Sequence, residues 1–81
     1  CAAPAVLSAI GLTKGRAVTS HPSVRAELKD EIIVDERVIA DGNIITGLGA
    51  GSAMEFAFKL VETLFGKEKV KEVNSGVLAK L

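Results

Sequence analysis

The only cysteine of the chain, Cys1, stands immediately ahead of an apolar segment that continues through Ala2, Ala3 and Pro4. This segment predicts a short helix over residues 4–10, because proline suits a first helical turn and Gly11 suits a helix end. Helix N-termini carry unpaired N–H groups and the positive end of the macrodipole, which favour thiolate over thiol. Since thiolate is the reactive form, the sequence predicts a nucleophilic or redox-sensing cysteine.

Other interpretations of Cys1 remain open. Free cysteines often fill space in a protein interior without any chemistry. A lipidated N-terminal cysteine is a second alternative, although a polar tether usually follows such a residue and an apolar helix follows Cys1. A third is an N-terminal nucleophile hydrolase, in which the α-amino group acts as the base.

The single histidine, His21, follows a short predicted strand over residues 17–19 and precedes Pro22. Catalytic groups gather where strands of α/β folds end in loops. A Cys/His pair of Cys1 and His21 is therefore one hypothesis. The other is that His21 is structural or simply solvated.

A glycine-rich loop over residues 47–52 precedes the longest predicted helix. Glycine backbone at a helix N-terminus can hold an anion. The loop lacks the Gly-Lys-Ser/Thr ending of a P-loop and the spacing of a dinucleotide fingerprint, so a tight strand-to-helix connection is favoured. Ser52 and Glu55 have the spacing of a capping box, and Lys59 and Glu62 are expected to form a surface ion pair.

The remaining pattern predicts an α/β layer architecture. The apolar helix is expected to be buried on several sides, and Ser20 or Ser23 is expected to cap a helix over 24–29. An Asp-Gly turn at residues 41–43 predicts a β-hairpin. The helix over 53–65 is expected to lie against a sheet and to expose only one narrow polar face to solvent. A further helix is expected from 67 to about 75.

Composition narrows the function classes. The 81 residues hold 10 basic and 10 acidic side chains, which gives no electrostatic footprint for nucleic acid or an anionic membrane. We expect no membrane span and no signal peptide, because the sequence shows neither pattern. One cysteine and one histidine allow no internal disulfide and too few ligands for structural zinc. We expect a cytoplasmic protein and, since the chain opens on a helix without methionine, a C-terminal portion of a larger domain.

Several motifs together resemble the ThiJ/PfpI superfamily in its DJ-one branch. The resemblance covers essentially the whole chain, residues 1–81, as the C-terminal portion of a single domain. It implies a flavodoxin-like three-layer α/β sandwich of the class I glutamine amidotransferase type, usually a homodimer. The motifs are Cys1-Ala2-Ala3-Pro4-Ala5, Thr19-Ser20-His21-Pro22, Asp41-Gly42-Asn43-Ile44-Ile45-Thr46, Gly49-Ala50-Gly51-Ser52-Ala53-Met54-Glu55-Phe56-Ala57 and Gly66-Lys67-Glu68-Lys69.

The resemblance also implies roles for three residues. Cys1 would occupy a nucleophile elbow, the N–H of Ala2 would be an oxyanion-hole donor, and His21 matches the family's histidine near the cysteine. The implied activity is a glyoxalase or deglycase that needs no cofactor or metal and acts on methylglyoxal or its early adducts on protein side chains. The alternative is a redox-sensing stress protein or chaperone that signals through oxidation of Cys1.

Two departures from the family pattern matter for these implications. Leu48 stands where the family usually has arginine, which removes a cation near the pocket or dimer contact. The family's glutamate that contacts the cysteine sulfur lies in the N-terminal portion, which we expect to be a partner of these residues. The fragment alone is therefore expected to be inactive.

Overall fold

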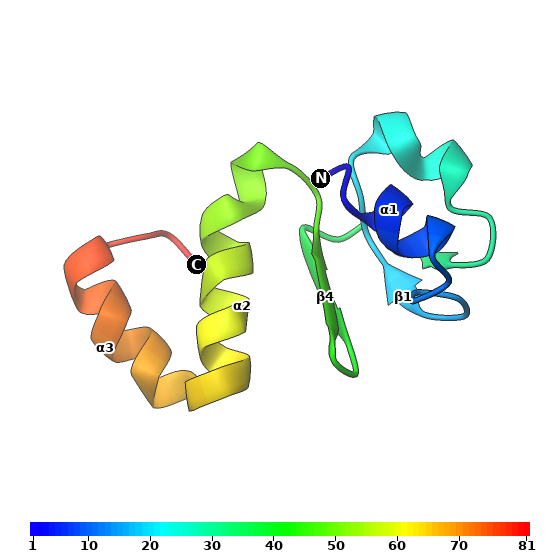
Figure 1. Ribbon diagram of the computed structural model, residues 1–81. Coiled ribbons are helices and arrows are strands. Elements are labelled where there is room, and N and C mark those ends of the chain that lie inside the picture. Colours follow the sequence, from blue (N-terminus) through cyan, green and yellow to red (C-terminus); the bar gives the residue numbers. More distant parts are fainter.

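A computed structural model describes all 81 residues, and their arrangement is shown in Figure 1. The chain contains both helices and strands, which pack on one another and confirm an α/β fold. The elements are α1 (Pro4–Ala9), β1 (Ala17–Val18), the 3-10 helix η1 (Pro22–Glu27), β2 (Ile32–Ile33), β3 (Val38–Asp41), β4 (Ile44–Gly47), the 3-10 turn η2 (Ala50–Ser52), α2 (Ala53–Phe65) and α3 (Lys67–Val77).

The strands form two small pairs. β1 and β2 are parallel, whereas β3 and β4 form the predicted antiparallel hairpin, with Val38 opposite Gly47. The hairpin turn needs a positive φ, and Gly42 supplies it at +61°. β1 packs beside β3, and the carboxylate of Asp41 accepts a hydrogen bond from the N–H of Ala17 at 2.7 Å. A side chain thus joins the two strand pairs.

Helix α2 is the central element of the C-terminal part. It packs against β3 and β4 on one side and α3 on the other, and Figure 1 shows it between them. Phe58 is its only buried residue. Gly66 separates the two helices with φ +91°. The predicted helix over 53–65 is confirmed, and the next helix extends two residues beyond the predicted end.

The prediction for the helix after His21 was wrong in type and in cap. The segment is a 3-10 helix over Pro22–Glu27, and the imidazole of His21, rather than Ser20 or Ser23, caps it. Proline at the first position holds the preceding residue in an extended conformation, and His21 has φ −59° and ψ 136°. This geometry lets the imidazole accept the N–H of Ser23.

The predicted capping box of α2 was also wrong. Ser52 makes no side-chain cap bond to α2, because its hydroxyl is engaged with Gly49 at 3.0 Å. The carboxylate of Glu55 pairs with Arg37 instead of turning back to the helix start. The predicted ion pair of Lys59 and Glu62 is confirmed at 3.6 Å.

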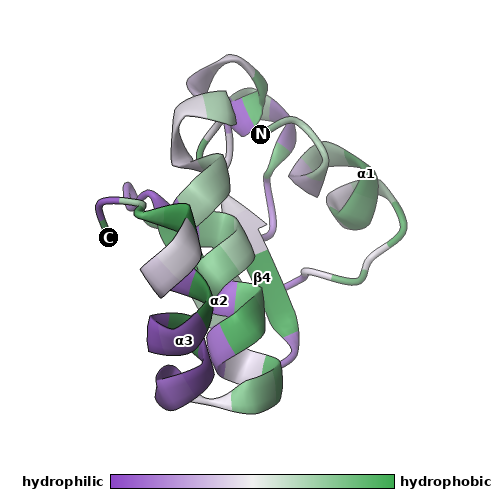
Figure 2. Ribbon diagram, turned by 90° about the vertical axis from the view of Figure 1, so that its left-hand side faces the viewer, coloured by the Kyte–Doolittle hydropathy of each residue, from purple (hydrophilic) through white to green (hydrophobic).

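The apolar helices are less covered than their composition predicts. Val6 and Ile10 are both 64% exposed, and Leu64 and Phe65 are about as open at 71% and 69%. Figure 2 shows hydrophobic residues on the outside of α1 and along α2. The prediction that α1 is buried on several sides was therefore wrong for the 81-residue chain, because no other part of the chain packs over Val6 and Ile10. None of the helices has the combined length and apolarity of a membrane span.

Candidate active site

The backbone of Cys1 is held between the ends of two strands. Its carbonyl accepts a hydrogen bond from the N–H of His21, and its amino nitrogen donates to the carbonyl of Gly47, each at 2.8 Å. His21 lies in the loop after β1, and Gly47 is the last residue of β4. Cys1 therefore lies at the carboxyl ends of these strands, the edge where α/β folds place reactive groups.

Cys1 is an exposed free thiol, and Ala2 leaves a hydrogen-bond donor beside it. The N–H of Ala2 makes no hydrogen bond within the 81 residues, while its carbonyl accepts the N–H of Ala5 at the start of α1. Pro4, the first residue of α1, is buried and fixes the start of the helix. An accessible sulfur and an adjacent unpaired N–H are the two parts required for addition to a carbonyl group.

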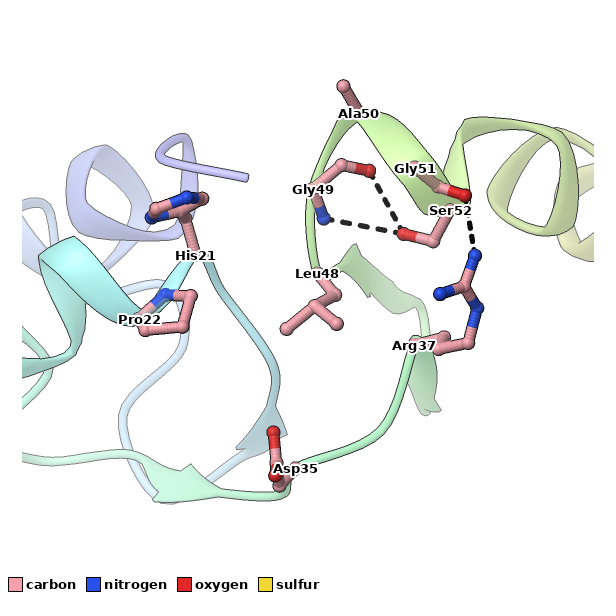
Figure 3. A pocket seen from close by; sticks show the side chains of 9 residues that line it. All are labelled: His21, Pro22, Asp35, Arg37, Leu48, Gly49, Ala50, Gly51 and Ser52. Atoms are coloured by element: carbon pink, nitrogen blue, oxygen red, sulfur yellow. Dashed lines mark hydrogen bonds between the residues drawn. The ribbon is translucent and has the colours of Figure 1, made fainter.

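The imidazole of His21 has a defined set of contacts. Its Nδ1 accepts the backbone N–H of Ser23 at 3.1 Å and lies 2.8 Å from the hydroxyl oxygen of Ser23. The other ring edge faces the glycine-rich loop, since a Cβ on Gly49 would lie 3.9 Å from Cδ2 of His21. Figure 3 shows His21 and this loop on opposite sides of a cavity of about 380 Å³.

The two candidate residues line different cavities. His21 lines the larger one with Leu48 and the residues around it, whereas Cys1 lines a smaller one of about 90 Å³ with Leu7, Thr46 and Phe56. The structure thus brings Cys1 and His21 together through a direct backbone hydrogen bond. Their side chains open onto adjoining but separate hollows of the surface.

Buried hydroxyl residues under the site were missed by sequence reasoning. Thr19, Ser20 and Thr46 are almost wholly buried. The N–H of Thr19 donates to the hydroxyl of Thr46 at 3.0 Å, and the hydroxyl of Ser20 donates to the carbonyl of His21 at 3.0 Å. The first bond joins the loop after β1 to β4, and the second lies within that loop. A run of polar residues after a strand gave no signal of burial, because such runs usually lie on the surface.

Arg37 organises the glycine-rich loop and was also missed. Its guanidinium donates to both carboxylate oxygens of Glu55 and to the carbonyl of Gly51, and its own carbonyl accepts the N–H of Leu48. Hydrogen bonding from Arg37 lowers the pKa of Glu55, and the carboxylate in turn raises the pKa of Arg37. The partners lie 18 residues apart, so no local spacing indicates the pair.

No group of three or more histidine, cysteine, aspartate or glutamate side chains is arranged to hold a metal ion. Asp35, which lines the larger cavity, instead pairs with Arg25 at 2.9 Å. The charged side chains around the site are thus committed to one another.

The fold and the position of Cys1 define the C-terminal part of a flavodoxin-like α/β domain with a cysteine at its strand ends. The model of the DJ-1/PfpI family matches residues 1–63. The chain therefore belongs to this family. This result confirms the resemblance inferred from the motifs.

Individual relatives agree with this assignment. The chain is 48% identical to protein dj-1beta of Drosophila melanogaster over 96% of its own length and 43% of the relative's. The crystal structure of Drosophila melanogaster DJ-1beta superimposes with a TM-score of 0.94 at 47% identity, covering 100% of this chain and 45% of that one. The glutathione-independent glyoxalase DJR-1.2 of Caenorhabditis elegans is 40% identical over 90% of the chain and 40% of its own length. The chain thus spans less than half the length of these relatives.

Proposed function

We propose that this chain carries the nucleophile of a cofactor-independent glyoxalase that acts on methylglyoxal or on its early protein adducts. The observation that carries the proposal is the exposed Cys1 thiol, hydrogen-bonded through its backbone to His21 and followed by the unpaired N–H of Ala2. The similarity to a relative named as a glutathione-independent glyoxalase supports the same reaction class.

In the proposed first step, the thiolate of Cys1 attacks the aldehyde carbon of methylglyoxal. A carbon–sulfur bond forms, and the electron pair of the carbonyl π bond moves to oxygen. The N–H of Ala2 stabilises this oxyanion together with a hydrogen bond from His21, and the proton that the Cys1 thiol lost on ionisation returns through solvent to give the neutral hemithioacetal.

Transfer of hydrogen from the former aldehyde carbon to the neighbouring carbon then gives a thioester, and water releases lactate and the free thiol. The net reaction adds one water to methylglyoxal, so it needs no external oxidant or reductant. The family's glutamate in the N-terminal portion is the proposed partner for the hydrogen transfer.

The test is methylglyoxal turnover by the full-length protein that carries these residues, under reducing conditions. Cys1→Ser is expected to reduce lactate formation at least a hundredfold, because the hydroxyl is a far weaker nucleophile than a thiolate. Ser75→Ala is the control, since this exposed hydroxyl bonds only the carbonyl of Glu72 in α3, outside the site. Full inactivity of the reduced wild type would refute the enzyme proposal.

The exposure of Cys1 also supports a second candidate function, a redox-sensing stress protein or chaperone. Two equivalents of hydrogen peroxide would each transfer one oxygen atom to the sulfur and leave as water, converting the thiolate to a sulfinate. The expected result is a mass increase of two oxygen atoms together with a changed melting temperature or binding profile. Oxidation that leaves stability and binding unchanged would exclude the sensor role.

We propose two macromolecular partners, the N-terminal portion of the same domain and a second copy of the protein. The exposed apolar faces of α1 and α2 support this, as does the coverage of only 43% of the Drosophila relative. Molar mass from light scattering would test the homodimer. A monomer at micromolar concentration would count against it.

A further inference from the structure

The contacts of His21 identify which of its ring nitrogens carries the proton. We infer that Ser23 is a positioning residue that holds the imidazole of His21 in its Nε2–H tautomer, so that the ring presents a hydrogen-bond donor to the site. This inference rests on the proposed function only for its catalytic consequence. The tautomer itself follows from hydrogen bonds in the structure.

The backbone N–H of Ser23 determines the role of Nδ1. This N–H lies 3.1 Å from Nδ1 of His21 and can act only as a donor. A protonated Nδ1 would place two N–H donors against each other and leave the Ser23 N–H without this partner. The neutral ring therefore accepts at Nδ1, and its proton lies on Nε2.

The hydroxyl of Ser23 lies 2.8 Å from the same nitrogen. A hydroxyl can rotate to donate or accept, so it can reinforce either tautomer. With Nδ1 already accepting from the backbone, the hydroxyl acts as a second donor that shares the single lone pair of that nitrogen in a bifurcated hydrogen bond. Ser23 is exposed, so its side chain contributes to ring orientation rather than to the core.

The local backbone makes these hydrogen bonds possible. Pro22 fixes the first residue of η1 and keeps His21 extended, which turns the imidazole back over the N–H of Ser23. Nε2 makes no hydrogen bond within the 81 residues. Because Cδ2, the carbon next to Nε2, faces Gly49 across the larger cavity, the free N–H lies on the cavity edge of the ring.

The consequence is a donor role for His21. A neutral imidazole with its proton on Nε2 can donate a hydrogen bond to an oxyanion, but transfer of that proton would leave an imidazolate. His21 would therefore stabilise negative charge as a hydrogen-bond donor, and the acid for the addition step and the base for the hydrogen transfer would come from other groups. Ser23 would support this role without touching the substrate.

The test is ¹⁵N NMR of the imidazole in the full-length protein that carries these residues, at alkaline pH. Wild type is expected to show His21 as a single Nε2–H tautomer. Ser23→Thr keeps the hydroxyl and Ser23→Val removes it at nearly equal size, so these two variants form a matched pair. Since the backbone N–H remains in every variant, Nε2–H should stay the main form, and we expect the Nδ1–H form to gain a minor population in Ser23→Val and Ser23→Ala but not in Ser23→Thr.

Turnover of methylglyoxal supplies a separate readout. The kcat of Ser23→Val is expected to fall about twofold to tenfold with KM unchanged, the effect of one lost hydrogen bond, and Ser23→Thr is expected to restore it. An Nδ1–H tautomer in wild type, or equal tautomer populations in Ser23→Val and Ser23→Thr, would overturn the inference. The expected tautomers in an inactive wild type would support the role of Ser23 and refute the glyoxalase proposal.

Discussion

The chain has two regions that are stabilised in different ways. Residues 1–52 consist of short elements joined by hydrogen bonds between side chains far apart in sequence, such as Glu31 with Ser8 and Thr13. Residues 53–81 form two regular helices with local hydrogen bonds and surface ion pairs three residues apart. The candidate catalytic residues all lie in the first region, and from the second region Phe56 lines the cavity of Cys1.

This difference shows where precision is needed. In the first region the fully buried side chains are mainly hydroxyl residues, and those of Thr13 and Ser52 hold particular segments through hydrogen bonds to Glu31 and Gly49. In the second region Phe58 is the one buried side chain, and it lines a hollow together with Val38 of the hairpin. Buried polar groups require specific partners, whereas apolar contacts tolerate small shifts, so the first region is suited to hold reactive groups in place.

The largest expected effect is at this apolar anchor. Phe58→Ala should lower the free energy of unfolding of the 81-residue chain by about 3 kcal/mol, because it opens a cavity between α2 and the hairpin. Phe65→Ala, which removes the same atoms from a side chain that is 69% exposed, should change it by less than about 1 kcal/mol. Urea unfolding measures both values. Equal losses would show that Phe65 is packed in solution and that the second region has more than one anchor.

The same contrast explains what could be predicted from sequence. The helix over 53–65 and the hairpin were predicted because periodicity and turn chemistry are local signals. The cap of η1 by His21 and the pairing of Glu55 with Arg37 were missed. Both depend on where a side chain points after the loops have packed, which spacing along the chain does not encode.

The candidate site follows this rule as well. The types of Cys1, Ala2 and His21 indicated their chemistry, and their motifs indicated the family. The contact of Ser23 with His21 could not be predicted, because serine at this position equally indicates a helix cap. The burial of Thr19 and Thr46 could not be predicted either, since their composition is that of a surface segment.

The next largest effect is expected at the polar contacts of the first region. Thr13→Val keeps the shape of a fully buried side chain but removes the hydroxyl that donates to Glu31 at 2.7 Å. The free energy of unfolding should fall by about 1.5–3 kcal/mol, as for a hydrogen bond to a charged group. Thr63→Val is the matched control in α2, where the hydroxyl bonds only the carbonyl of Lys59, and it should cost less than about 0.5 kcal/mol. A larger loss of stability for Thr63→Val than for Thr13→Val would reverse the comparison between the two regions.

The charge of Glu31 should give the first region a pH dependence. The hydrogen bond from Thr13, aided by that from Ser8, lowers the pKa of Glu31 below its ordinary value of 4.5. Since the folded state prefers the ionised form, its stabilisation is complete above about pH 4.5 and is lost as pH falls through the lower folded-state pKa. The stability difference between wild type and Glu31→Gln should therefore be largest at neutral pH and shrink in acid.

Urea unfolding of wild type and Glu31→Gln at a series of pH values measures this difference, and groups common to both proteins cancel. Glu36→Gln, which alters an exposed carboxylate in the same part of the chain, is the control and should show a nearly constant difference. A difference for Glu31→Gln that grows as the solution is acidified would contradict the assigned direction of the pKa shift.

The smallest effect is expected at the ion pairs on α3. Lys71 lies 3.4 Å from Glu68, and their side chains are 75% and 90% exposed. Lys71→Ala should change the free energy of unfolding by only about 0.3 kcal/mol, because solvent screens the charges and ordering two long side chains costs entropy. A double-mutant cycle with Glu68→Ala isolates the pair. A coupling above about 1 kcal/mol would show that the second region also depends on specific polar contacts, and the distinction between the two regions would then be one of length and regularity alone.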